Sequence, residues 1–227
     1  PEGKLLMTRT PAERHDSTLR PPRRPLDPTK IPTVSVGYGS GCHETGTWYR
    51  AYLRDAPGGQ RDCRYFSSGS GRYDISFPGG TLNLAGTEEV AIREKLGAEL
   101  INRDMVPMDE FDGVYVARVQ LPRVFKVADF RQAFGGFAPG DISSALSHAE
   151  GYSVTQQWAE AVREAGLEGI IARSRFSSGS ALYLFGTSGE NREFGSIGGE
   201  ETALSVARAI PFFPEIVSVE EEEFEFE

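Results

Sequence analysis

Residues 81–94 read TLNLAGTEEVAIRE, and this stretch decides the interpretation of the fold. Hydrophobic residues that alternate over Thr81–Ala85 predict a short strand. After Gly86, Thr87 has the side chain of a helix N-cap, and the two glutamates that follow it would lie at the positive end of the helix dipole. The stretch therefore predicts a strand followed directly by a helix that runs to about Arg103.

Glu94 is the most informative residue of this predicted helix. On a helical wheel its side chain projects between Val90, Ala98 and Ile101, on the apolar face. A carboxylate on an apolar face costs free energy unless it has partners. Two interpretations stay open: the carboxylate reaches the edge of the core or pairs with an arginine, or it belongs to a functional site.

The remaining periodic segments predict a fold of mixed strands and helices. Further strands are expected at Thr47–Leu53, Gly113–Leu121, Ile170–Ala172 and Ala181–Phe185, and further helices at Val154–Ala165, capped by Ser153 and ended by Gly166, and at Glu201–Ala209. These elements do not alternate regularly, as parallel βαβ units would. The pattern therefore predicts an α+β fold, with a mixed or mainly antiparallel sheet and flanking helices.

Composition divides the chain into three parts. Seven of the 14 prolines lie in residues 1–32, so residues 1–33 are expected to form a Pro/Arg-rich extended arm. Residues 34–213 are expected to form a single catalytic domain. Residues 214–227 carry seven glutamates and no cation, which predicts a disordered acidic tail.

Charge and composition exclude several classes of function. The chain has 227 residues and a net charge of −9, which argues against nucleic acid or an anionic membrane as partner. No run approaches the roughly 20 apolar residues of a membrane-spanning helix. No secretory signal is visible, so a cytoplasmic location with Cys42 and Cys63 as free thiols is expected. The three histidines are scattered, so no metal site is expected.

Two arginines and a serine are the other candidates for chemistry. Arg50 lies in an otherwise apolar and aromatic strand, and Arg72 follows a turn rich in serine and glycine. Guanidinium groups bind phosphates and carboxylates in a bidentate manner, although structural ion pairs are their commoner use. Ser174 follows a predicted strand, where catalytic groups are frequent, but a lone serine there is usually a turn former. The chain contains neither a G-x-S-x-G nucleophile motif nor a P-loop.

The segment Phe-Ser-Ser-Gly-Ser occurs twice, at Phe66–Ser70 and Phe176–Ser180. Arg64 and Arg175 lie just before the two copies. This combination suggests loops that bind phosphate. Two unrelated Ser/Gly turns are the alternative, and we favour them because such turns are common.

Together these residues resemble the RES domain family, which is named for an Arg, a Glu and a Ser in its active site. The matching stretches are Trp48–Arg50, Ser70–Tyr73, Leu82–Ala85, Val90–Glu94 and Gly169–Arg175. Each motif alone is weak. Their order is more specific, as are the equal steps of 22 residues from Arg50 to Arg72 and from Arg72 to Glu94.

The resemblance implies a fold like that of ADP-ribosyltransferases and the function of a toxin in a bacterial toxin–antitoxin pair. Members degrade NAD by phosphorolysis, with inorganic phosphate as second substrate, or by hydrolysis, or they ADP-ribosylate a target. An Xre-type antitoxin is the implied partner. By position, the candidate catalytic residues are Arg50, Glu94 and Ser174, and the candidate NAD-binding residues are Arg50, Arg72, Tyr73 and Asn83. Asn83 departs from the family, which often has tyrosine there.

Other functions stay open. A mono-ADP-ribosyltransferase with a protein target needs the same NAD site, so the sequence does not separate it from an NAD-degrading enzyme. A non-catalytic interaction module would agree with the acidic tail and with Asn83. A serine hydrolase that uses Ser174 and His148 is the least favoured alternative.

Overall fold

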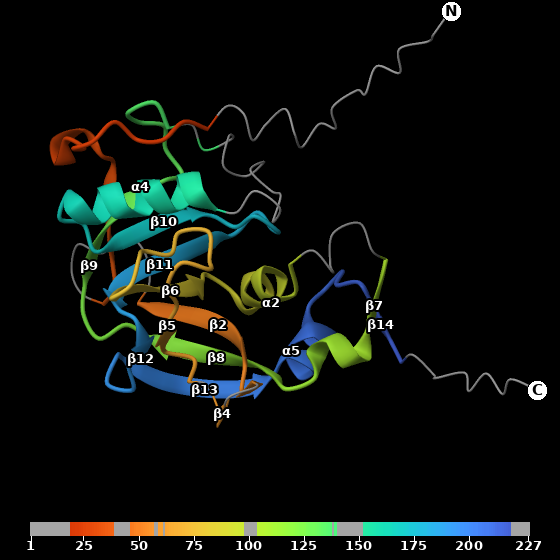
Figure 1. The fold of residues 1–227 in the computed structure, drawn as a ribbon. Helices are drawn as coiled ribbons and strands as arrows, with labels where there is room; N and C mark the ends of the chain where they lie inside the picture. Colours follow the sequence, from red (N-terminus) through yellow and green to blue (C-terminus); the bar gives the residue numbers. More distant parts are fainter. Residues whose placement is uncertain are drawn as a thin grey trace, which may run out of the picture.

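The computed structural model describes residues 19–38, 46–56, 59–60, 62–97, 104–137, 139 and 152–218 (Figure 1). The strands are β1 Thr33–Val36, β2 Thr47–Leu53, β3 Asp55–Ala56, β4 Gly59–Gln60, β5 Tyr65–Phe66, β6 Gly79–Ala85, β7 Met105–Pro107, β8 Val114–Gln120, β9 Phe125–Asp129, β10 Gly169–Arg173, β11 Ser180–Thr187, β12 Gly189–Glu190, β13 Ser196–Thr202 and β14 Glu215–Val217. The helices are η1 Pro28–Lys30, α2 Glu88–Leu96, η3 Met108–Phe111, α4 Ser153–Glu164 and α5 Ala203–Ala209. The fold is α+β, as the sequence predicts.

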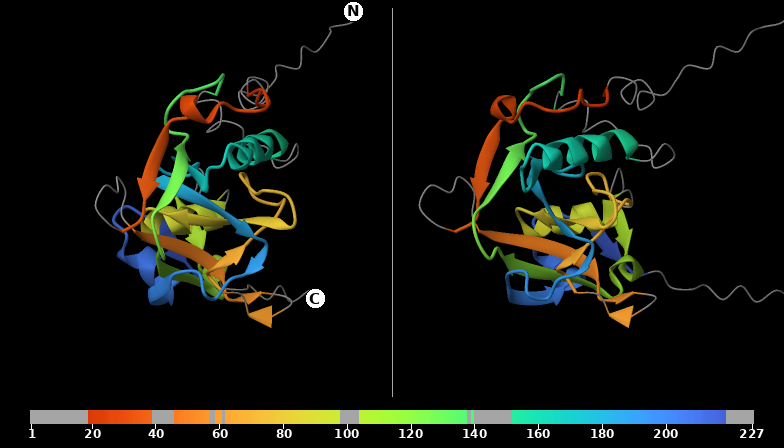
Figure 2. Two further views of the ribbon diagram at one scale, coloured as in Figure 1. Left: turned by 90° about the vertical axis from the view of Figure 1, so that its left-hand side faces the viewer. Right: turned by 60° about the vertical axis from the view of Figure 1, so that its left-hand side comes forward.

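An eight-stranded sheet forms the centre of the molecule, in the order β1-β9-β10-β11-β6-β2-β8-β13. Its neighbouring strands are antiparallel except for β9 and β10, which run parallel. Helix α4 lies along the β9–β10 side, and α2 and α5 lie toward the other end (Figures 1 and 2). The pairs β5–β12, β7–β14 and β3–β4 form small separate ladders.

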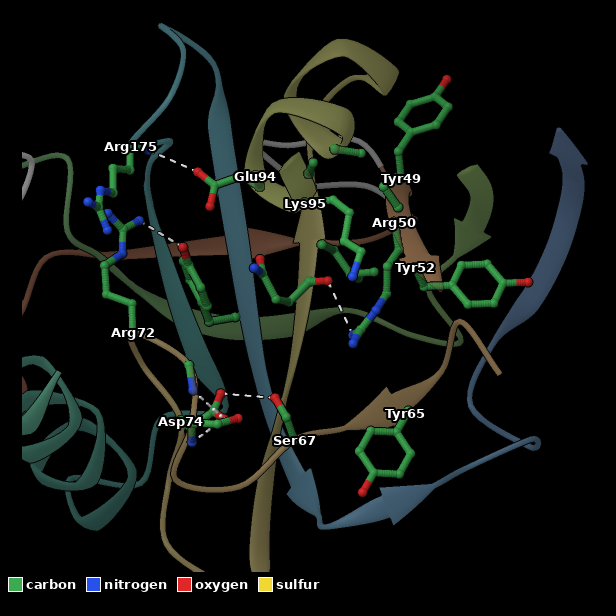
Figure 3. Close-up of a pocket in the computed structure, with 18 of the residues that line it drawn as sticks. Tyr49, Arg50, Tyr52, Tyr65, Ser67, Arg72, Asp74, Glu94, Lys95 and Arg175 are labelled. Carbon is green, nitrogen blue, oxygen red and sulfur yellow. Dashed lines mark hydrogen bonds between the residues drawn. The ribbon is translucent and has the colours of Figure 1, made fainter. Parts of the chain in front are cut away.

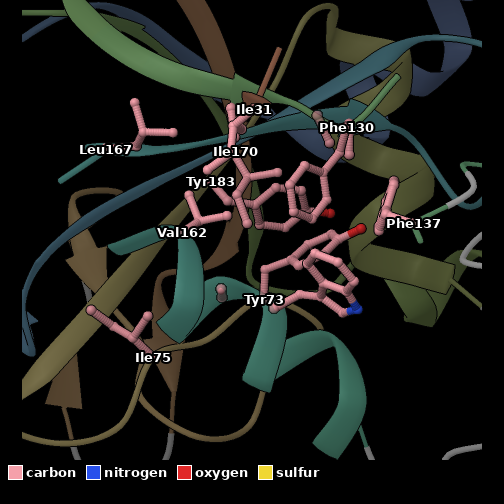
Figure 4. Close-up of a cluster of buried hydrophobic side chains, with 14 of the residues drawn as sticks. Ile31, Tyr73, Ile75, Phe130, Phe137, Val162, Leu167, Ile170 and Tyr183 are labelled. Carbon is pink, nitrogen blue, oxygen red and sulfur yellow. The ribbon is translucent and has the colours of Figure 1, made fainter. Parts of the chain in front are cut away.

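The period of two along a strand divides the core between the faces of the sheet. On β11, Leu182 and Leu184 pack with Trp48 and Phe66, whereas Tyr183 points to the opposite face. That face packs under α4, where Trp158 contacts a cluster of phenylalanines (Figure 4). A third cluster lies between α2, α5 and β8.

Several predicted boundaries shift for local reasons. The helix predicted to reach Arg103 ends at Leu96, because Gly97 takes a φ of 52° and its N–H caps the carbonyl of Arg93. Residues 98–103 lie outside the described residues. Ser153 is the first residue of α4, and Tyr152 occupies its N-cap position.

The C-terminal helix also starts later than predicted. It begins at Ala203, because the preceding residues extend β13 and Thr202 caps the helix. No alternating pattern predicts β13, because this strand is exposed throughout and contains two adjacent glycines. The predicted strand at Gly113–Leu121 and the helix over Val154–Ala165 match β8 and α4 to within about one residue at each end.

The described part of the predicted arm packs on the domain. Leu19 and Ile31 are each 6% exposed and join the cluster under α4. Trp158 donates from Nε1 to the carbonyl of Arg20 at 2.9 Å, and Arg24 donates to the carbonyl of Gln157 at 2.9 Å. Residues 19–32 therefore lie across α4 as a strap. The acidic tail beyond residue 218 lies outside the described residues, and no helix among those described has the length and apolar character needed to span a bilayer.

Replacing Trp158, which is 1% exposed, tests this packing. Trp158→Ala removes the largest side chain between α4 and the strap, so we expect it to lower the free energy of unfolding by roughly 3–5 kcal/mol. Arg24→Ala breaks a half-exposed ion pair with Glu164 and should cost less than about 1 kcal/mol. Urea unfolding measures both. A cost below about 1 kcal/mol for Trp158→Ala would show that the strap and α4 do not share this core.

Candidate active site

A cavity of about 400 Å³ opens between β2, β6, α2 and two loops, residues 62–74 and 173–176 (Figure 3). This volume lies in the range of small-molecule sites. Four of the six predicted site residues line it: Arg50, Arg72, Asn83 and Glu94. Ser174 contacts the cavity wall through Glu94. Tyr73 lies behind the wall.

Glu94 meets two hydrogen-bond donors from the turn after β10. Ser174 Oγ donates to Glu94 Oε1 at 2.6 Å, and the backbone N–H of Arg175 donates to the same oxygen at 2.9 Å. Ser174 is only 5% exposed, and its Oγ accepts from the N–H of Phe176 at 3.2 Å. The fold thus joins a glutamate and a serine that are 80 residues apart. Ser174 holds the carboxylate in place, and the other carboxylate oxygen faces the cavity.

Arg72 is buried beside this carboxylate. Its Nη2 donates to the hydroxyl of Tyr183 at 2.7 Å and to the carbonyl of Arg173 at 3.2 Å. Burial opposes the charge, but Tyr183, Tyr73 and Glu94 outweigh it and raise the pKa of Arg72. The guanidinium is therefore charged at neutral pH.

Tyr73 supports Arg72 from the core. It is fully buried, packs edge-on against Tyr183 and Phe130, and lies with its ring centroid 5.0 Å from the Arg72 guanidinium carbon. Tyr73 was predicted from the sequence as an NAD-binding residue. Its burial assigns it instead to packing behind Arg72.

Arg50 reaches the cavity from the middle of β2. Its Nη1 donates to the carbonyl of Asn83 on the neighbouring strand β6, at 3.4 Å. Burial lowers the pKa of Arg50 to about 10, and Asp74 partly opposes this effect. A group with a pKa of about 10 is protonated at pH 7, so the cavity contains a second cation, which is partly buried.

Asp74 is a site residue that the sequence analysis missed. Its carboxylate is buried and accepts hydrogen bonds from Ser67 Oγ at 3.1 Å and from the backbone N–H groups of Ser70 and Gly71 at 3.2 and 2.8 Å. It thereby closes the loop that ends at Arg72. In an ordinary Asx turn the aspartate bonds an N–H group that follows it, whereas Asp74 accepts from N–H groups that precede it, so the turn signal alone does not predict this contact.

Helix α4 holds the same loop from outside. Gln156 donates from its amide nitrogen to the carbonyls of Gly69 and Gly71, at 3.1 and 2.9 Å. Thr155 donates from its hydroxyl to the carbonyl of Arg72. Helix α4 therefore helps to position the Arg72 guanidinium, although the side chains of Thr155 and Gln156 do not line the cavity.

The two Phe-Ser-Ser-Gly-Ser segments come to the same cavity. Ser67 and Ser70 of the first line it, as does Phe176 of the second. Several other lining residues are not among the six predicted site residues, and examples are Tyr52, Tyr65 and Lys95. Such residues carry no motif, because their part in the site depends on the folding of distant segments.

The described residues give less support to a metal site, a cysteine nucleophile or a serine hydrolase. They contain no group of three or more His, Cys, Asp or Glu that could hold a metal ion. Burial raises the pKa of Cys63 to about 12, so this thiol is protonated at neutral pH and is a poor nucleophile. His148, the base of the hydrolase alternative, lies outside the described residues.

Comparison with known proteins places this arrangement in a family. The RES domain family matches residues 47–195, a range that contains Arg50, Arg72, Glu94 and Ser174. The chain belongs to the RES domain family. The sequence matches no curated protein. Among solved structures, the crystal structure of the M. tuberculosis MbcT–MbcA toxin–antitoxin complex is similar at 12% sequence identity and a TM-score of 0.48, covering 88% of this chain and 97% of that chain.

Removal of the Asp74 carboxylate tests the loop. Asp74→Ala leaves the N–H groups of Ser70 and Gly71 without their acceptor, so we expect a loss of roughly 1–3 kcal/mol in the free energy of unfolding. Ser67→Ala removes a single neutral hydroxyl donor and should cost about 1 kcal/mol or less. Urea unfolding of both variants gives the comparison. Equal stability of Asp74→Ala and the unaltered chain would contradict the role of Asp74.

Proposed function

We propose that the chain is an NAD-consuming enzyme that breaks the nicotinamide–ribose bond, and that it acts as the toxin of a bacterial toxin–antitoxin pair. The observation that carries the proposal is the Glu94 carboxylate, held by Ser174 Oγ and the Arg175 N–H in a cavity that also contains Arg50 and Arg72. Membership of the RES domain family supports the choice of NAD.

A fixed carboxylate suits this reaction. Cleavage of the nicotinamide–ribose bond gives the ribose an oxocarbenium-like positive charge, as in glycoside cleavage. A preorganised anion beside the ribose stabilises that charge, and in a water-poor cavity the effect is large. Nicotinamide leaves as a neutral molecule from a cationic ring, so the leaving group needs no proton. The reaction at Glu94 therefore needs no histidine to protonate the leaving group.

The arginines suit the rest of the substrate. NAD carries a diphosphate, and guanidinium groups bind phosphate oxygens with two N–H donors. Arg50 lies on strand β2 and Arg72 lies in the loop before β6, but both side chains line the same cavity. We assign them to the phosphates, with Asn83 as a neutral polar contact nearby.

Glu94→Gln tests the reaction, because it keeps the shape and removes the charge. We expect nicotinamide release from NAD to fall by about 100-fold to 1000-fold. Ser174→Ala frees the carboxylate and should lower the rate by a smaller factor. Glu89→Gln is the matched control: Glu89 lies on the same helix, is 43% exposed and pairs with Arg93, so activity should not change. Nicotinamide release that is equal in Glu94→Gln and the unaltered chain would overturn the proposal.

The same assay identifies the group that accepts ADP-ribose from NAD. With inorganic phosphate present, ADP-ribose phosphate as product assigns phosphorolysis, and ADP-ribose with or without phosphate assigns hydrolysis. Label from NAD that appears on protein assigns the alternative, a mono-ADP-ribosyltransferase. Intact NAD under all conditions, in the presence of candidate targets, would favour the remaining alternative, a non-catalytic interaction module.

The toxin assignment makes a separate prediction in cells. Expression of the chain in bacterial cytoplasm should deplete NAD and stop growth, whereas Glu94→Gln should do neither. Co-expression of an Xre-type antitoxin encoded beside it should restore growth. Growth arrest by both forms, with NAD unchanged, would show that toxicity does not come from this site. Cell counts and NAD measurements at equal protein levels provide the test.

A further inference from the structure

Two tyrosines form an aromatic part of the cavity wall that the proposed reaction does not use. Tyr52 comes from β2 and Tyr65 from β5, and both are partly exposed and line the cavity. In the view of Figure 3 they lie on the far side of Arg50 and Lys95 from Glu94. The cavity therefore has an aromatic part at a distance from its carboxylate.

The Tyr52 ring is held by a neighbour outside the cavity, and the Tyr65 backbone is held by a strand ladder. The hydroxyl of Tyr52 donates to Glu200 of β13, and Glu200 also pairs with Arg54. Tyr65 lies in the β5–β12 ladder, opposite Glu190. A ring that is already fixed loses little conformational entropy when a ligand packs on it, which favours binding.

Cations lie between the two parts of the cavity. Arg50 and Lys95 line its middle. From one end to the other the cavity thus offers a carboxylate, two cationic side chains and two aromatic rings. A dinucleotide has the matching order: a ribose that becomes cationic, a diphosphate, and a flat purine base that stacks on aromatic rings.

We infer that Tyr52 and Tyr65 form a binding site for the adenine base of the substrate. Lys95 joins Arg50 at the phosphate of the adenosine half, and Arg72 is left to the phosphate of the nicotinamide half. The inference rests on the proposed function and extends it: the enzyme selects dinucleotides over mononucleotides. Stacking supplies the selectivity, because nicotinamide mononucleotide offers the same scissile bond without the adenine.

Substrate comparison tests this site. The unaltered chain should release nicotinamide from NAD with a kcat/KM at least about 10-fold above that for nicotinamide mononucleotide, since base stacking contributes a factor of this order or more. Tyr65→Ala should lower the value for NAD by about 10-fold, mainly through KM, and leave the mononucleotide unchanged. Tyr65→Phe keeps the ring and should keep the preference. Tyr115→Ala is the control, because Tyr115 pairs with Tyr52 on the next strand but does not line the cavity.

Equilibrium binding of ADP makes the test independent of catalysis. ADP has the adenine and the diphosphate but no bond to cleave, and Tyr65→Ala should weaken its binding by about 10-fold, with pyrophosphate binding unchanged. Equal kcat/KM for NAD and the mononucleotide would overturn the adenine site, as would ADP binding that is unaffected by Tyr65→Ala. Absence of nicotinamide release, with ADP binding sensitive to Tyr65, would instead overturn the proposed reaction and keep the site.

Discussion

The contact between Glu94 and the turn after β10 is the interaction on which the site depends. A partly buried carboxylate must replace the hydrogen bonds it had with water, and here one hydroxyl and one backbone N–H do so. Both donors come from a turn that begins where β10 ends. The contact therefore fixes α2 against the centre of the sheet and leaves the second carboxylate oxygen toward the cavity.

Arg72 depends on a longer chain of support. Asp74 closes its loop from within, and Gln156 of α4 holds the same loop from outside. Helix α4 is in turn packed between the sheet and the strap of residues 19–32 through Trp158. Because each layer positions the next, a substitution in the strap or in α4 acts on the cavity without contacting it.

The sequence alone predicts those structural elements whose signals come from neighbouring residues in the chain. Strand β2 follows from its aromatic and β-prone residues, and the start of α2 follows from an N-cap at Thr87, which accepts from the N–H of Val90. Glu94 could be singled out because a charge on an apolar helix face is unusual. The end of the helix was harder to predict, because it depends on the backbone conformation of Gly97. In the sequence, the apolar residues Ala98 and Ile101 continue the spacing of the apolar helix face beyond this glycine.

The parts that could not be predicted depend on contacts between distant segments. Asp74 is an ordinary turn aspartate until the fold buries it at the cavity. The strap carries many prolines and cations, which are typical of unpacked segments, yet Leu19 and Ile31 bury it against α4. Strand β13 pairs with β8 through its backbone, and no side-chain pattern is needed for that.

The residues at the two ends of the cavity are supported by different parts of the fold: central strands of the main sheet at one end, and an edge strand and a small separate ladder at the other. Glu94 contacts the turn that follows β10, and Arg72 contacts Arg173 of β10 and Tyr183 of β11. These two central strands pack side chains on both faces of the sheet. Tyr65 rests on a two-residue strand paired only with β12, and Tyr52 is anchored to the edge strand β13. Charge stabilisation in a transition state needs fixed geometry, whereas stacking tolerates small displacements of a ring. Under the proposed function, the groups assigned to bond cleavage therefore rest on the central strands, whereas Tyr65, assigned to substrate choice, lies on a small separate ladder.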